Sequence, residues 1–98
     1  MISILKSAQH ELDEAFDFYE AQLFGLGYEF IDEFEKAVKR IEQFPEAWQS
    51  FSLNTRRCQF NRFPYAIIYD IYEENIVIIA VAHLHRRPFY WKHRRKTK

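Results

Sequence analysis

The segment Ile76–Ala82 constrains the fold most, because it holds seven consecutive Ile, Val and Ala residues. A strand without polar positions is typical of one that is buried on both faces. Tyr65–Tyr72 precedes it, with alternate Tyr and Ile residues on one side. The polar turn Glu73–Asn75 joins the two segments, so we predict an antiparallel hairpin. The rest of the chain must supply elements that cover it.

Two helices are predicted ahead of this hairpin. Apolar residues recur at steps of three and four along Ala8–Leu23 and again along Phe30–Ile41. Gly25 suits the left-handed conformation that ends a helix, and Gly27 is expected to reinforce the break. Pro45 ends the second pattern, because proline cannot continue the hydrogen-bond ladder. The short connection predicts an αα-hairpin with a strongly aromatic face.

The remaining elements complete the predicted fold class, α+β. Met1–Lys6 is β-prone and suits a border strand, Arg57–Phe63 alternates like a strand, and Pro88 suits the first turn of a short helix. We therefore expect an N-terminal strand and an α-helical hairpin packed on a small antiparallel β-sheet, with a short C-terminal helical turn. Residues 1–98 are predicted to form a single domain, because two cores would each be too small. A hydrophobic content of 48% argues against disorder.

The net charge of zero conceals two oppositely charged halves. Residues 1–55 carry four basic and eleven acidic side chains, whereas residues 56–98 carry ten basic and three acidic ones. Seven of the basic residues lie from Arg86 onward, with no acidic residue among them. This asymmetry indicates that the C-terminal half meets a polyanion or an acidic partner. The alternative is that the two halves attract each other and aid folding.

The sequence predicts a cytoplasmic protein that does not enter a membrane. The N-terminus lacks the apolar core and cleavage site of a signal peptide, and no stretch approaches the length of a membrane span. The single cysteine, Cys58, cannot form an internal disulfide, which suits a reducing compartment. Its place on the apolar side of a strand favours a buried, inert thiol.

We expect neither a metal nor a cofactor. His83 and His85 form an H-x-H pair, but zinc normally requires four ligands and no carboxylate lies nearby in the sequence. The only glycines, Gly25 and Gly27, lie in the interhelical turn, so there is no phosphate-binding loop. The acidic side chains are expected to lie mainly on the solvated faces of the helices.

Basic and aromatic residues remain as the candidate site. We expect the sheet to bring together residues that flank its strands with residues near the C-terminus: Arg56, Arg57, Arg62, His83, His85, Arg86, Arg87, Tyr90 and Trp91. Guanidinium groups bind phosphates, and aromatic rings stack on bases. Such groups can also support metal-free RNA cleavage. The alternative is that Tyr90 and Trp91 cover the sheet edge and that the arginines are ordinary surface residues.

The same segments resemble the ParE/RelE superfamily, the toxins of bacterial type II toxin–antitoxin modules. The resemblance rests on Arg62–Tyr69 (RFPYAIIY) and His83–Trp91 (HLHRRPFYW), and it extends through the helical pattern over nearly the whole chain. It implies two helices against a small antiparallel sheet, in agreement with the order of elements deduced from the residues. The C-terminal ending of this sequence is more similar to ParE than to RelE.

The resemblance implies one of two activities. RelE-like members cleave mRNA on the ribosome, whereas ParE-like members inhibit DNA gyrase and need not be enzymes. Tyr90 matches the C-terminal tyrosine of the RelE type, but Ala66 and Leu84 stand where mRNA-cleaving members carry arginines. A metal-free cleavage site does not easily lose two phosphate-binding groups, which argues against the nuclease.

The leading hypothesis is therefore a ParE-like toxin that inhibits DNA gyrase and is neutralised by a cognate antitoxin. The acidic or amphipathic segment of the antitoxin would meet the positive half of the chain, with apolar anchors near Phe51 and Leu53 or on the hairpin. The first alternative is a metal-independent endoribonuclease that acts on mRNA in the ribosome. Its working residues would be Arg56, Arg57, Arg62, Arg86 and Tyr90. The second alternative is a non-toxic binding module.

Overall fold

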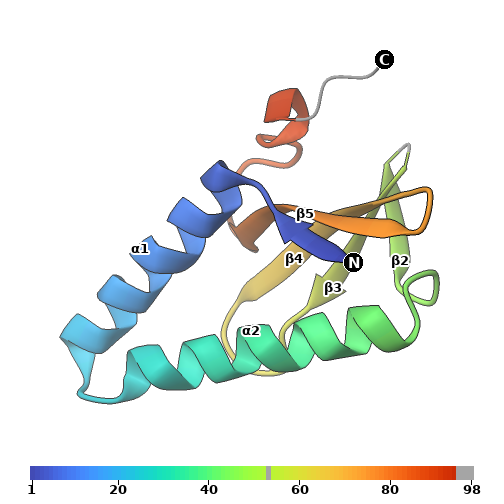
Figure 1. Cartoon of the computed structure of the whole chain (residues 1–98). Coiled ribbons are helices and arrows are strands. Elements are labelled where there is room, and N and C mark those ends of the chain that lie inside the picture. The colour runs from blue at the N-terminus through green and yellow to red at the C-terminus, as the bar shows by residue number, and fades with distance from the viewer. Residues whose placement is uncertain (53, 95–98) are drawn as a thin grey trace.

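Within the described part of the chain, five strands form one mixed sheet, in the spatial order β1-β5-β4-β3-β2 (Figure 1). The strands are β1 (Ile2–Ile4), β2 (Gln49–Ser52), β3 (Thr55–Gln59), β4 (Tyr65–Tyr72) and β5 (Asn75–His83). β1 runs parallel to β5, and the other neighbours are antiparallel. The computed structural model describes residues 1–52 and 54–94. The side chains of Phe51 and Leu53, the expected apolar anchors, lie outside the described residues.

Two helices form the predicted hairpin, which confirms the α+β fold class. Helix α1 (Lys6–Gln22) packs against β5, and α2 (Leu26–Gln43) packs against β3. The helices meet at one end of the molecule and diverge from there (Figure 1). In the described ranges, neither these helices nor the short 3₁₀ turn η1 (Lys92–Arg94) is long and apolar enough to cross a membrane.

The sheet and the C-terminus differ from the prediction in detail. Strand β2 was not predicted, because its four polar and aromatic residues give no clear alternation. The parallel pairing of β1 makes the sheet mixed rather than antiparallel. The helical turn begins at Lys92 rather than at Pro88. Phe89 has a φ of 62°, which is incompatible with a right-handed helix and delays it.

Strand β5 contains a bulge that explains its continuous apolar sequence. In the register with β4, Ile68 pairs with Ala80 and Tyr69 pairs with Ile78, so Ile79 is an extra residue. Ile78 consequently faces the helices, while Ile79 and Ala80 both belong to the cluster on the other face. Both faces are thus filled without strict alternation.

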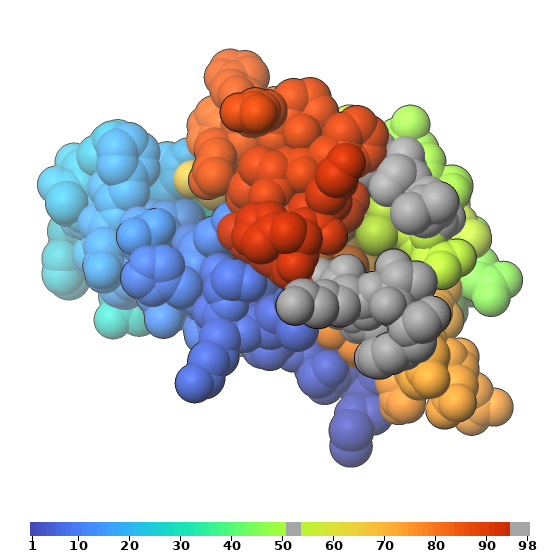
Figure 2. Space-filling view, turned by 90° about the horizontal axis from the view of Figure 1, so that it is seen from above, coloured from blue at the N-terminus to red at the C-terminus, as the bar shows by residue number. Residues whose placement is uncertain are grey.

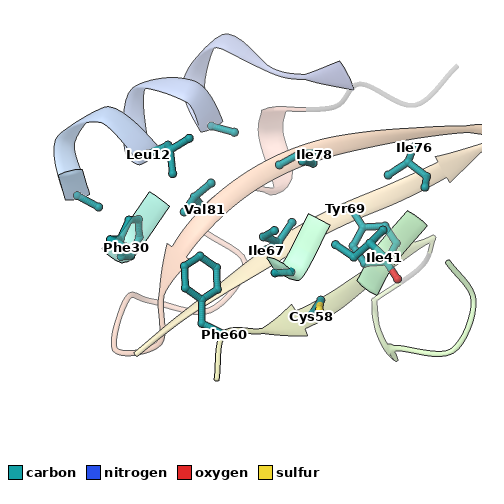
Figure 3. Close-up of a cluster of buried hydrophobic side chains, with 13 residues drawn as sticks. Leu12, Phe30, Ile41, Cys58, Phe60, Ile67, Tyr69, Ile76, Ile78 and Val81 are labelled. Atoms are coloured by element: carbon teal, nitrogen blue, oxygen red, sulfur yellow. The ribbon is translucent and has the colours of Figure 1, made fainter. Parts of the chain in front are cut away.

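The main core lies between the helices and the sheet (Figure 3). Leu12 from α1 and Phe30 and Ile41 from α2 pack over Ile67 and Val81, and all five are buried. Burial of each such side chain stabilises the fold by about 1.5–3 kcal/mol. This core fixes α1 against β5, which in turn positions the residues of α1 that face the C-terminus.

The C-terminal segment (residues 84–94) covers the opposite face of the sheet. Trp91 is only 4% exposed and packs in a cluster with Ile68, Ala80 and Ala82. In the space-filling view this segment, coloured orange to red, lies across the top of the molecule beside α1 (Figure 2). The expectation that β5 is buried on both faces is therefore confirmed.

The turn between the helices is stabilised by one carboxylate. Both oxygens of Glu20 accept backbone hydrogen bonds, from the N–H of Gly25 and from the N–H of Gly27, each at 2.9 Å. Gly25 has a φ of 90°, as predicted for a residue that ends the first helix. Gly27 does not break the chain, because it lies inside α2, where it allows close contact with Phe16 of α1.

We predict that Gly27→Ala destabilises the protein by about 1–3 kcal/mol, because the added methyl group overpacks this contact. A Cβ at this position would lie 2.8 Å from the backbone oxygen of Phe16, which cannot easily move. Urea unfolding measures the loss. Gly25→Asn is the control, because no atom of the described residues lies within 4 Å of a Cβ there and asparagine tolerates positive φ. Equal losses in the two variants would contradict the packing argument.

Candidate functional site

A largely buried ion pair attaches the C-terminal segment to α1. The carboxylate of Glu11 accepts hydrogen bonds from Nη1 and Nη2 of Arg94, both at 2.8 Å. It also accepts a hydrogen bond from the Tyr90 hydroxyl at 2.7 Å. The side chains of Glu11 and Arg94 are only 11% and 14% exposed. This two-pronged geometry in a site with little solvent gives a strong contact.

The same pair completes the outer edge of β5 where β1 has ended. The N–H of Val81 donates to Glu11 Oε1 at 3.0 Å, and Nη1 of Arg94 donates to the carbonyl of Ile79 at 3.2 Å. Backbone groups at a sheet edge need such partners once water is excluded. Glu11 and Arg94 therefore do for this part of β5 what a neighbouring strand does elsewhere.

Tyr90 is held by its hydroxyl and by its ring. Burial and the hydrogen bond to Glu11 raise the pKa of Tyr90 well above its ordinary value, so the phenol stays protonated. The guanidinium of Arg86 lies over the Tyr90 ring, 3.9 Å from its centroid. The hydrogen bond to Glu11 raises the pKa of Arg94. Tyr90 thus fixes the segment and positions Arg86.

A pocket lies between this segment and the sheet. Its floor is formed by small and apolar side chains, including Ala66, Ile68 and Ala82, and Arg57, Arg86 and Arg87 are among its lining residues. The cavity volume is about 70 Å³, whereas small-molecule sites usually have ~300–1,000 Å³. An adjoining, more open hollow shares the residues from Arg87 to Tyr90 and adds Lys92 and His93. The arrangement suits an anionic group on a larger partner better than an enclosed small molecule.

The two histidines lie differently with respect to this pocket. His83 lines it, while His85 is exposed, with its ring 5.1 Å from that of His83. Burial lowers the pKa of His83, and the neighbouring His85 and Arg86 lower it further. Its Nδ1 accepts the backbone N–H of His85 at 3.0 Å, which requires that nitrogen to be unprotonated.

The structure brings six of the nine predicted site residues to the pocket. These six are Arg57, His83, Arg86, Arg87, Tyr90 and Trp91. Trp91 is buried in the apolar cluster beneath the pocket, in agreement with the alternative that this residue covers the sheet. All nine candidates were predicted to form one cluster, and for Arg56 and Arg62 that prediction is wrong.

Arg56 and Arg62 face α2 and the loop that follows it. Arg56 donates to the carbonyl oxygens of Glu46 and Trp48, at 3.1 and 2.9 Å. Arg62 pairs with Glu29 of α2, with Nη1 and Oε1 2.9 Å apart. Successive residues of a strand point to opposite faces, so Arg56 and Arg57 cannot serve the same site.

Three carboxylates with structural roles were not predicted. The acidic residues were expected mainly on solvated helix faces, but Glu11 and Glu20 bind the groups described above. Glu33 is 6% exposed and accepts the backbone N–H of Arg62 at 2.9 Å. For two of them the helical spacing could have indicated this position. Glu11 lies three residues after Ala8 and Glu33 lies three after Phe30, which places each on the apolar side of its helix.

Within the described ranges, no three His, Cys, Asp or Glu side chains lie close enough to hold a metal ion. Cys58 is buried, and burial raises the pKa of its thiol above its usual value. The predicted buried thiol is confirmed.

The strand, helical hairpin and mixed sheet define a known fold class of small α+β proteins. A solved structure described as the chromosomal ParDE TA system from P. aeruginosa matches with a TM-score of 0.73. The match covers 86% of this chain and 95% of that chain, at 18% sequence identity, and it shows a common fold. No curated protein matches the sequence.

The sequence itself identifies the family. The family model described as ParE toxin of type II toxin-antitoxin system, parDE, matches residues 2–88. The chain belongs to this family and is a toxin of the type II toxin–antitoxin class. The resemblance to ParE is thereby confirmed. Tyr90, Trp91 and Arg94 follow the matched range.

Proposed function

We propose that this toxin arrests bacterial growth by inhibiting DNA gyrase, and that a cognate antitoxin neutralises it. The observation that supports a binding role is the pocket, where Arg57, Arg86 and Arg87 surround a floor of small apolar side chains. Arginines at such a pocket bind phosphate or carboxylate groups. The Tyr90 hydroxyl donates a hydrogen bond to Glu11, so it is committed to holding the segment.

The antitoxin is proposed to cover this same pocket. The neighbouring P. aeruginosa structure is described as a ParDE system, and this chain belongs to the toxin family of that pair. An acidic, amphipathic segment complements the arginines by charge and the floor of Ala66, Ile68 and Ala82 by its apolar residues. Such a segment would neutralise the toxin by occupying the groups that contact the target.

We predict that the double variant Arg86→Ala/Arg87→Ala inhibits gyrase supercoiling about 100-fold less than the wild type. The loss of two charge-assisted contacts of roughly 1.5 kcal/mol each accounts for this factor. Both residues are exposed, so the melting temperature should change little. The assay uses purified gyrase holoenzyme and relaxed plasmid DNA, with a thermal melt of each variant.

Lys36→Ala/Lys39→Ala is the matched control, because it removes the same charge from exposed positions on α2. It should inhibit like the wild type. Equal loss in both double variants would point to net charge rather than to the pocket. If the wild type leaves supercoiling unchanged while cells still stop growing, gyrase is not the target.

The mRNA endonuclease is the second candidate, favoured by one observation. Arg57, His83 and Arg86 line a single pocket, which suits a phosphodiester. Against it, Ala66 and Leu84 line the pocket where the mRNA-cleaving type has arginines, and Tyr90 is bound to Glu11. Mapping mRNA 5′ ends after induction separates the two, because new cuts within translated codons would favour the nuclease. Unimpaired growth would favour a non-toxic module.

A further inference from the structure

Large apolar side chains are exposed at the hairpin tip (residues 18–28), where α1 ends and α2 begins. Phe24 is 94% exposed, Leu23 63% and Tyr28 66%. Phe18, on the last part of α1, is 55% exposed. This tip, blue-cyan in the space-filling view, projects to one side of the sheet and of the C-terminal segment (Figure 2). Single exposed apolar residues are ordinary, but four large ones within eleven positions make the tip a candidate interaction surface.

Hydrogen bonds and close packing hold the tip in one conformation. Glu20 binds the N–H groups of Gly25 and Gly27, and the close packing of Gly27 on Phe16 locks α1 against α2. Tyr28 packs edge-on against Phe16, with ring centroids 5.0 Å apart. A preorganised surface loses little conformational entropy on binding, and exposed aromatics on such a surface are the usual anchors of protein interfaces.

The charge around the tip restricts the partner. From Glu11 to Glu35 the sequence has nine acidic residues and no lysine or arginine. Glu11, Glu20 and Glu33 are used internally, and Asp32 and Glu29 pair with Lys36 and Arg62. Asp17 is exposed beside the tip. This surface repels the phosphates of DNA and RNA. It complements a protein surface with basic residues around an apolar recess.

From these observations we propose that the hairpin tip inserts Leu23 and Phe24 into a basic protein surface of the cellular target. This rests on the proposed function only in requiring that the chain arrests growth by binding a protein. The molecule then contacts its target through two surfaces of opposite charge. The basic pocket takes an anionic group, and the acidic tip takes a basic protein surface.

The test compares two double variants in cells with inducible expression. Leu23→Ala/Phe24→Ala should need at least tenfold more protein to arrest growth than the wild type. Phe44→Ala/Tyr72→Ala is the matched control, since Phe44 and Tyr72 are 64% and 56% exposed outside the tip, and it should arrest growth like the wild type. Immunoblots quantify the protein, and thermal melts establish that both variants fold.

A charge variant tests whether the surface that receives the tip is basic. Asp17→Lys reverses one exposed charge beside the tip. It should weaken growth arrest several-fold in the wild-type background, while Glu46→Lys, on the loop after α2, should not. If Leu23→Ala/Phe24→Ala arrests growth at wild-type protein levels, the proposal is wrong.

Two measurements distinguish this proposal from self-association through the tip and from the gyrase assignment. Sedimentation of the purified wild type should show a monomer, and a dimer that Leu23→Ala/Phe24→Ala abolishes would assign the tip to self-association and overturn the proposal. Supercoiling by purified gyrase reports on the target independently. If the wild type arrests growth without inhibiting gyrase and the tip variant does not arrest growth, the gyrase assignment fails and the tip proposal stands.

Discussion

Replacement of Glu11 by alanine is expected to destabilise the protein by about 3 kcal/mol, the loss typical of a buried ion pair that keeps one partner. Glu11 binds Arg94, the Tyr90 hydroxyl and the N–H of Val81. In Glu11→Ala these groups lose their acceptor in a site with little water. In a protein of this size the melting temperature should fall by roughly 10–20 °C.

The control for this variant lies one turn further along the same helix. Among the described residues Glu14 pairs with His10 alone, and both side chains are about two-thirds exposed at 67% and 71%. Glu14→Ala should therefore leave the melting temperature almost unchanged. Glu11→Gln retains an acceptor for Val81 but loses the charge pairing with Arg94, so its stability should be intermediate. A Glu11→Ala protein as stable as Glu14→Ala would contradict the proposed role of the ion pair.

Glu11→Ala should also weaken toxicity beyond its effect on folding. Tyr90 positions Arg86, and the C-terminal segment forms one wall of the pocket. Hydrogen exchange at the Val81 amide reports the local opening directly, since that N–H donates to Glu11. Exchange at wild-type rates would mean that water or another group replaces the carboxylate without cost.

The second large effect is expected for Phe30→Ala, which should destabilise the protein by about 3–5 kcal/mol because it leaves a cavity in the main core. Phe30 is fully buried and lies at the centre of an aromatic cluster. Its ring centroid is 5.4 Å from that of Tyr19, 5.2 Å from that of Phe60 and 4.8 Å from that of Tyr65. Guanidinium unfolding measures the loss.

Phe44→Ala provides the comparison, because Phe44 is 64% exposed at the end of α2 and should change stability by less than about 0.5 kcal/mol. A small loss in Phe30→Ala would show that the surrounding rings collapse into the space. Typical domains have only ~5–15 kcal/mol of stability, so this variant should also accumulate poorly in cells.

The elements that could be predicted were those whose residues carry a local pattern. The apolar spacing of α1 and α2, the positive φ of Gly25 and the continuous run of β5 each depend on nearby residues. β2 could not be found in this way, because its strand is short and depends on pairing with β3. The parallel position of β1 depends on the chain passing across the sheet through both helices.

The site was only partly predictable for a related reason. The sequence indicated which residue types form the site. The course of the backbone decides which of them lie on the same face of the sheet. Arg56 and Arg57 are neighbours in the sequence but lie on opposite faces of β3, which strand alternation alone could have indicated. The contacts of Glu11 with Tyr90 and Arg94 join residues about eighty positions apart, and no local pattern encodes such a meeting.

The way Glu11 and Arg94 occupy the outer edge of β5 has a consequence for the toxin when it is released from its antitoxin. An open strand edge with bare amides and carbonyls is a template on which another copy can add its own strand, and this is a common route to aggregation. Here charged side chains already hold the Val81 amide and the Ile79 carbonyl. Beyond the end of β1, this part of β5 therefore does not offer those groups to a neighbouring molecule.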